Sequence, residues 1–129
     1  MGRIVAQVRV SNVLTAADTL EMSALVDTGA AYLTLPSAWK TRLGELEVIS
    51  IIDAERANQT TVRCELCGPV RLQIEGFWQL FGEVLFMDMA PDEHGGYEPL
   101  VGCLPLEQSQ AAVDVLGHRL IRLANVDAK

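Results

Sequence analysis

Asp27, Thr28 and Gly29 follow directly on a run of apolar and small residues, in the stretch "ALVDTGAA" at residues 24–31. A carboxylate at the end of an apolar strand would be partly withdrawn from water, and a neighbouring hydroxyl can both donate and accept a hydrogen bond. The glycine permits backbone torsions, or a close approach of another segment, that a side chain would block. Two interpretations are open: a rigidly held carboxylate that does chemistry, or an acid that caps a turn.

The cysteines offer a weaker signal. Cys64 and Cys67 form a C-x-x-C pair and Cys103 stands alone, an odd number that does not suggest a disulfide framework. No second pair follows, and His94 and His118 lie far away without ligand-like spacing. Buried thiols are therefore favoured over a zinc or redox site, and we expect neither a metal nor a cofactor.

The composition narrows the class of protein. The chain of 129 residues is half hydrophobic, which suits one folded domain over residues 1–129 with a substantial core. A formal net charge of −7 argues against binding to nucleic acid or to an anionic membrane surface. No apolar run reaches the roughly 18 residues of a membrane-spanning helix, and the N-terminal pattern is not that of a signal peptide. A soluble cytoplasmic protein is the expectation.

Short strands separated by turns dominate the chain. Residues 4–10 alternate between apolar and polar side chains, as a half-buried strand does, and a polar turn region is expected around Ser11, Asn12, Ala17 and Asp18. The other strands are expected at residues 20–26, 32–36, 47–55, 60–75, 77–89 and 99–102, with a final hairpin over 113–123. Gly68-Pro69 predicts a bulge or bend. This pattern favours a mostly-β barrel or sandwich.

Two short helices interrupt the strands. The first is expected over residues 37–44, capped by Ser37 and ended by Gly44, with Trp39 and Leu43 facing the core. The second is expected within residues 104–112. Residues 56–60 are interpreted as a polar hairpin tip and 90–99 as a loop.

Two motifs together resemble those of retroviral-type, or retropepsin-like, aspartic proteases. "ALVDTGAAYLTLP" is similar to the active-site segment of that family, in which Asp27 would be catalytic and Thr28, Gly29 and Ala30 would support it. "PLVGCLPLE" is similar to the second signature, with Leu100, Val101 and Gly102 beside the catalytic loop. The resemblance covers roughly residues 4–124 and implies a closed β-barrel of the acid-protease fold. It also implies a flap over the substrate, with its tip near Ala57, Asn58 and Gln59.

The resemblance further implies an aspartic endopeptidase in which two aspartates share one proton and activate a water. Asp-Thr-Gly occurs once in the chain, and the other six aspartates lack a following Thr-Gly or Ser-Gly. The second carboxylate should therefore be Asp27 of another copy, in a symmetric homodimer that binds a peptide or protein substrate.

Three departures from the viral pattern keep an alternative open. Ala31 and Cys103 stand where viral enzymes usually carry a mutually paired Asp and Arg, and the tip of the expected flap is not glycine-rich. Losing both partners leaves no charge buried alone. This favours a cellular or prokaryotic relative. The alternative is a catalytically inactive retropepsin-fold module for dimerisation or peptide binding.

Overall fold

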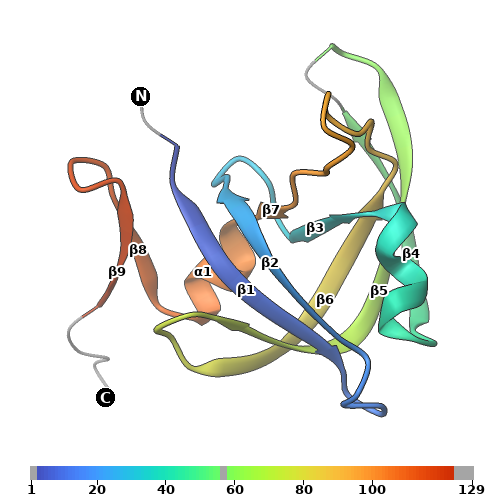
Figure 1. Cartoon of the computed structure of the whole chain (residues 1–129), viewed down its shortest axis with the longest axis horizontal. Coiled ribbons are helices and arrows are strands. Elements are labelled where there is room, and N and C mark those ends of the chain that lie inside the picture. The colour runs from blue at the N-terminus through green and yellow to red at the C-terminus, as the bar shows by residue number, and fades with distance from the viewer. Residues whose placement is uncertain (1–2, 56–57, 124–129) are drawn as a thin grey trace.

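The computed structural model describes residues 3–55 and 58–123 (Figure 1). Strands dominate these residues, with one short 3-10 helix and one short α-helix. The elements in order are β1 Val5–Asn12, β2 Thr19–Val26, β3 Leu33–Pro36, η1 Ser37–Leu43, β4 Glu47–Glu55, β5 Thr61–Ile74, β6 Gln79–Met87, β7 Leu100–Val101, α1 Cys103–Gln108, β8 Ala111–Asp114 and β9 Arg119–Arg122. The mostly-β prediction is confirmed.

Six of the strands close a ring. They run in the order β1-β2-β7-β3-β6-β5, and β5 pairs back with β1. The long strand β5 makes this possible, because Val70–Ile74 pairs with β1 while Thr61–Gly68 pairs with β4 outside the ring. The register of β5 against β6 shifts between Cys67 and Val70, so the irregularity expected at Gly68-Pro69 is present. The barrel expected from the sequence is thus found as a ring of strands.

Strand β1 shows how the alternation builds the barrel wall. Val8 and Val10 are buried, whereas Gln7 and Arg9 face outwards. The polar turn region expected around Ser11, Asn12, Ala17 and Asp18 is confirmed only in its second part. Ala17 and Asp18 lie in the turn before β2, but Ser11 and Asn12 continue β1. The polar side chain that suggested a turn is instead buried.

Asn12 ties three segments together from this buried position. Its Nδ2 donates to the carbonyl oxygens of Leu43 and Glu45, at 2.8 Å each, and its Oδ1 accepts the backbone N–H of Leu14 at 2.9 Å. All polar atoms of the side chain are therefore used, which makes its burial tolerable.

The helix η1 covers one end of the core. Leu43 is fully buried there and Trp39 packs against the same core cluster, as expected. The capping prediction was wrong: Pro36 is the N-cap residue, it supplies no side-chain hydrogen bond, and Ser37 lies inside the helix. Gly44 does end the helix, with a φ of 70° that favours glycine.

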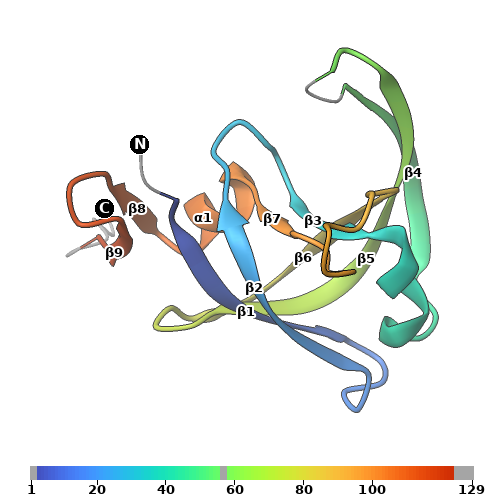
Figure 2. The same cartoon turned by 45° about the horizontal axis from the view of Figure 1, so that its top comes forward.

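The hairpin of β4 and β5 projects from the ring beside β3 and β6 (Figure 2). Its outer strand β4 carries Val48, Ile49 and Ile51, each more than 40% exposed. Its inner face contributes to a second, smaller apolar cluster with Leu66 and Leu85. This cluster is separate from the main core inside the ring.

The strands β8 and β9 form a separate two-stranded sheet, on the opposite side of the ring from β4 (Figures 1 and 2). The expected C-terminal hairpin is thereby confirmed over Ala111–Arg122. Among the described residues, no helix is long and apolar enough to cross a membrane.

Candidate active site

Asp27 begins a tight loop at the end of β2. Its backbone N–H donates to the carbonyl oxygen of Val101 at 3.0 Å, and its carbonyl oxygen accepts the N–H of Ala30 at 3.1 Å. The Asp27 carboxylate accepts the N–H of Gly29 at 3.0 Å. The side chain is half-buried. Main-chain and side-chain bonds together therefore fix the direction of this carboxylate.

The second motif lies between the two arms of the Asp27 loop. In β7, Leu100 and Val101 pair in parallel with Leu25 and Val26 of β2, directly before Asp27. Leu100 also pairs with Thr34 of β3, on the far side of the loop. The expected proximity of the two motifs is present, because β7 is held on both edges by the strands that enter and leave the loop.

Three further hydrogen bonds join the residues after β7 to the loop. Gly102 N donates to Tyr32 O at 3.1 Å, Cys103 N to Ala30 O at 2.8 Å, and Leu104 N to Ala31 O at 2.9 Å. These bonds satisfy N–H groups at the start of α1 that have no partner within the helix. The same bonds hold the loop in place, so the short helix and the loop stabilise each other.

Glycine is required at position 102 for steric reasons. A Cβ atom there would lie 2.5 Å from the carbonyl carbon of Ala31 and 2.6 Å from the nitrogen of Tyr32. The steric constraint at Gly29 is weaker, since a Cβ atom there would lie 3.2 Å from Oδ1 of Asp27. The close approach suggested by the sequence at Gly29 is thus accompanied by a closer one at Gly102.

The Thr28 hydroxyl forms none of the hydrogen bonds that hold the loop. The Thr28 side chain is exposed, and its hydroxyl has no hydrogen-bond partner within residues 3–55 and 58–123. Ala30 is half-buried and serves the loop through its backbone. The loop therefore presents one half-buried carboxylate and one unused hydroxyl.

The residues predicted for a flap tip lie in the β4–β5 hairpin. Asn58 and Gln59 are exposed in its turn, and Gln59 has a left-handed φ of 67°. Asn58 Oδ1 accepts hydrogen bonds from both the N–H and the hydroxyl of Thr60. Ala57 lies outside the described residues. That this hairpin acts as a flap stays a prediction.

A half-buried apolar surface lies beneath the β4–β5 hairpin. Tyr32, which leaves the Asp27 loop, packs in the second apolar cluster beneath the β4–β5 hairpin. Ile52, Ala54 and Val62 on the inner face of the hairpin, together with Met87, are only half-buried there. The alternation "IIDA" and "TVRC" marks these faces, but only the folded chain brings them beside Tyr32.

The cysteines do not form a joint site. Cys64 is buried in the second cluster whereas Cys67 is buried in the main core, so the two thiols of the C-x-x-C pair lie in different clusters. All three cysteines are reduced thiols. Burial raises the pKa of the Cys67 thiol above its usual value. Within the described part of the chain, no group of three His, Cys, Asp or Glu side chains could hold a metal ion.

Two solved structures are similar to this chain. EIAV protease complexed with the inhibitor HBY-793 matches with a TM-score of 0.58 and 17% sequence identity, over 83% of this chain and 88% of that chain. A retropepsin-like aspartic protease from Rickettsia conorii matches with a TM-score of 0.44 and 16% identity, over 88% of this chain and 85% of the other. No protein-family model and no curated protein matches this sequence. The likeness to the EIAV enzyme shows that the chain has a retropepsin-like fold.

Proposed function

We propose that this protein is an aspartic endopeptidase that works as a symmetric homodimer, with Asp27 as the catalytic carboxylate of each copy. The observation that carries the proposal is the fixed Asp27 carboxylate at a strand end, held by Gly29 N and braced by β7 within a retropepsin-like fold. A turn-capping acid would not need a second segment that is hydrogen-bonded to its own N–H and to the carbonyl oxygens of Ala30, Ala31 and Tyr32.

The proposed reaction needs two carboxylates that share one proton. The ionised Asp27 takes a proton from a water molecule, while the oxygen of that water bonds to the peptide carbonyl carbon. The protonated Asp27 of the partner subunit donates its proton to the carbonyl oxygen. The resulting gem-diol loses one hydroxyl proton to the ionised carboxylate of the partner subunit's Asp27 as the C–N bond breaks. The first Asp27, now protonated, donates its proton to the leaving nitrogen, and the pair again shares one proton.

Two exposed features of the chain support the proposal of a homodimer. The Thr28 hydroxyl has no partner among the described residues, and it could hydrogen-bond across a two-fold axis to the loop of the other chain. The β8–β9 hairpin, with its turn and the residue that follows β9, also exposes four aliphatic side chains outside the barrel. They are Val115, Leu116, Ile121 and Leu123. Such a surface is typical of a contact with another chain.

The β4–β5 hairpin supports an extended peptide as the substrate. Strand β4 pairs only with β5 among the described residues, so one edge offers N–H and C=O groups to an added strand. The half-buried side chains of Tyr32, Ile52 and Val62 would suit apolar substrate side chains. We therefore expect cleavage between or beside apolar residues.

Incubation with a mixture of peptides, followed by mass spectrometry of the products, tests the proposal. Cleavage should be strongest at mildly acidic pH and blocked by a statine-type transition-state mimic. Asp27→Asn should abolish cleavage while sedimentation still shows a dimer, and Glu45→Gln, an exposed carboxylate away from the loop, should retain both. Activity that survives Asp27→Asn would refute the proposed chemistry. A dimer that binds peptides without cutting them would instead identify the inactive peptide-binding module.

A further inference from the structure

A hollow of about 210 Å³ opens on the outer face of the barrel, over β2, β1, β5 and β6. We call it the two-arginine hollow because two cationic side chains line it and no carboxylate does. The polar side chains of its lining are Arg9, Ser11, Thr19, Arg71, Gln73 and Gln79.

The strand register explains why these residues meet. Ser11 of β1 lies opposite Thr19 of β2 on one side and opposite Arg71 of β5 on the other. Two residues before Ser11 on β1, Arg9 lies opposite Gln73 of β5, and Gln73 lies opposite Gln79 of β6. Because alternate residues share a face, these side chains form two adjacent polar rows across four strands.

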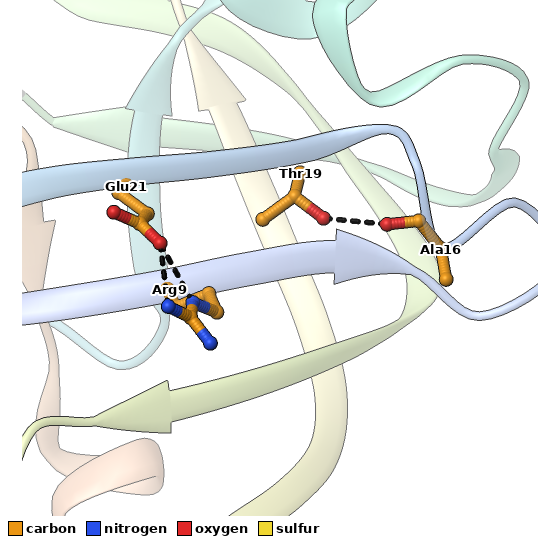
Figure 3. A network of polar contacts seen from close by, with 4 residues as sticks. All are labelled: Arg9, Ala16, Thr19 and Glu21. Carbon is orange, nitrogen blue, oxygen red and sulfur yellow. Dashed lines mark hydrogen bonds and ion pairs between the residues drawn. The ribbon is translucent and has the colours of Figure 1, made fainter.

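The two arginines differ in how their charge is used. Arg9 Nε donates to Oε1 of Glu21 at 2.8 Å, and Arg9 Nη2 lies 2.7 Å from the same oxygen in an ion pair (Figure 3). Arg71 forms no ion pair with any described residue, and its guanidinium carbon lies 5.4 Å from the centre of the Phe81 ring. Its Nε–H is buried and has no hydrogen-bond partner. A buried donor without an acceptor is unfavourable unless something else occupies the site.

Two other side chains of the hollow already donate hydrogen bonds to backbone carbonyl oxygens. The Thr19 hydroxyl donates to the carbonyl oxygen of Ala16 at 2.7 Å (Figure 3), and Gln73 Nε2 donates to Phe77 O at 2.9 Å. The Arg71 guanidinium, the Ser11 hydroxyl and the Gln79 amide form no hydrogen bond with another described residue, so all of their donors are left for an occupant. All three would be satisfied by oxygen acceptors.

An adjacent hollow of about 340 Å³ has the opposite balance of charge. It shares Arg9 and Gln73 with the two-arginine hollow, but Glu21 and Glu75 also line it. An anion would be repelled from those carboxylates and attracted towards Arg71. The charge pattern thus distinguishes the two hollows, although they share Arg9 and Gln73.

We propose that the two-arginine hollow is a binding site for a small oxyanion, a carboxylate or a phosphate group, held by the Arg71 guanidinium with Ser11 and Gln79. Charge-assisted hydrogen bonds from a guanidinium to two oxygens are strong and directional, which suits this set of donors. The site is distinct from the candidate active site. Glu21, beside the hollow, precedes Asp27 by six positions on β2, or about 20 Å of extended chain.

Titration of the protein with inorganic phosphate and, separately, with succinate tests this site. The ¹H–¹⁵N signal of the Arg71 Nε–H should shift and saturate with one of these ions, and sodium chloride at matched ionic strength should leave it unchanged. Comparison of the two titrations tells a phosphate site from a carboxylate site. The wild-type signal reports on the site even where a variant does not fold.

Two variants on β5 sharpen the test. Arg71→Met should weaken binding about tenfold or more, since it removes the charged donor. Arg63→Met removes an exposed arginine of the same strand that does not line the hollow, and should bind as the wild type does. An Nε–H signal that moves equally with chloride would overturn the proposal, as would equal affinities of the two variants for both oxyanions.

Discussion

A side chain on Gly102 would collide with Ala31, because a Cβ atom built on Gly102 lies 2.5 Å from the Ala31 carbonyl carbon. The other nearest atoms are the nitrogen of Tyr32 at 2.6 Å and the carbonyl oxygen of Ala30 at 2.7 Å. All three belong to the backbone of the segment that leaves Asp27, so none can rotate out of the way. The missing side chain thus sets how closely the second motif approaches the first.

Gly102→Ala should therefore destabilise the protein by about 3 kcal/mol, because the Asp27 loop must move as a backbone unit. The free energy of unfolding in urea measures the loss. Gly82→Ala is the matched control, since its nearest atom would be a Leu72 methyl at an ordinary 3.6 Å, and we expect a change below about 1 kcal/mol. Equal losses in both variants would contradict the steric account.

Asn12→Ala should cost about 3 kcal/mol of stability. The change leaves the carbonyl oxygens of Leu43 and Glu45 and the N–H of Leu14 without the partners they now have. Asn58→Ala, which removes an exposed amide from a hairpin turn, should change the unfolding free energy by less than about 1 kcal/mol. Thermal and urea unfolding of the two variants should agree on this order, and a reversed order would argue against the network.

Thiol labelling should distinguish the three cysteines. Cys64 and Cys67 are 1% and 0% exposed, and burial raises the pKa of Cys67, which further lowers its thiolate fraction. A thiol-reactive disulfide reagent should therefore modify Cys103 first in the folded protein, and all three thiols in denaturant. Cys103→Ser should remove the fast phase. A fast phase that persists in this variant would mean that the β5 thiols open to solvent.

Acid should weaken the β8–β9 hairpin through Asp114. The N–H of Gly117, with help from the Arg119 guanidinium, holds the pKa of Asp114 below its ordinary 3.8. Because the folded pKa is lowered, the stabilisation is present above pH 3.8 and is lost as the pH falls through the folded pKa. The difference in Tm between wild type and Asp114→Asn should thus be positive near neutral pH and vanish in acid. A difference that does not depend on pH would assign the effect to packing.

Local patterns predicted most of the strands, and nonlocal contacts decided what those patterns left open. Alternation in residues 4–10 was enough to place the inner and outer faces of β1. It could not show that Asn12 continues the strand, because its three partners come from segments up to 33 residues away. The cap predicted at Ser37 failed for a local reason, since Pro36 already supplies an extended residue before the helix.

For the candidate site too, local motifs predicted some features, and others depend on contacts between distant segments. Asp-Thr-Gly at a strand end pointed to Asp27, and the apolar-apolar-glycine motif pointed to Gly102. The steric need for Gly102 depends on three backbone atoms more than 60 positions earlier in the chain, and no spacing rule expresses that. The half-buried surface around Tyr32 and Ile52 likewise exists only once the β4–β5 hairpin lies against the ring.

The division of β5 into two ladders makes the hairpin adjustable in length. Thr61–Gly68 pairs with β4, and only Val70–Ile74 closes the ring with β1. Residues added to β4 and β5 in matched pairs near the turn would lengthen the hairpin while every ring pairing keeps its register. Addition of a single residue would instead turn the inner and outer faces of the hairpin over, because strand side chains alternate. The length of the β4–β5 hairpin is therefore a property that evolution or design can vary in steps of two residues per strand.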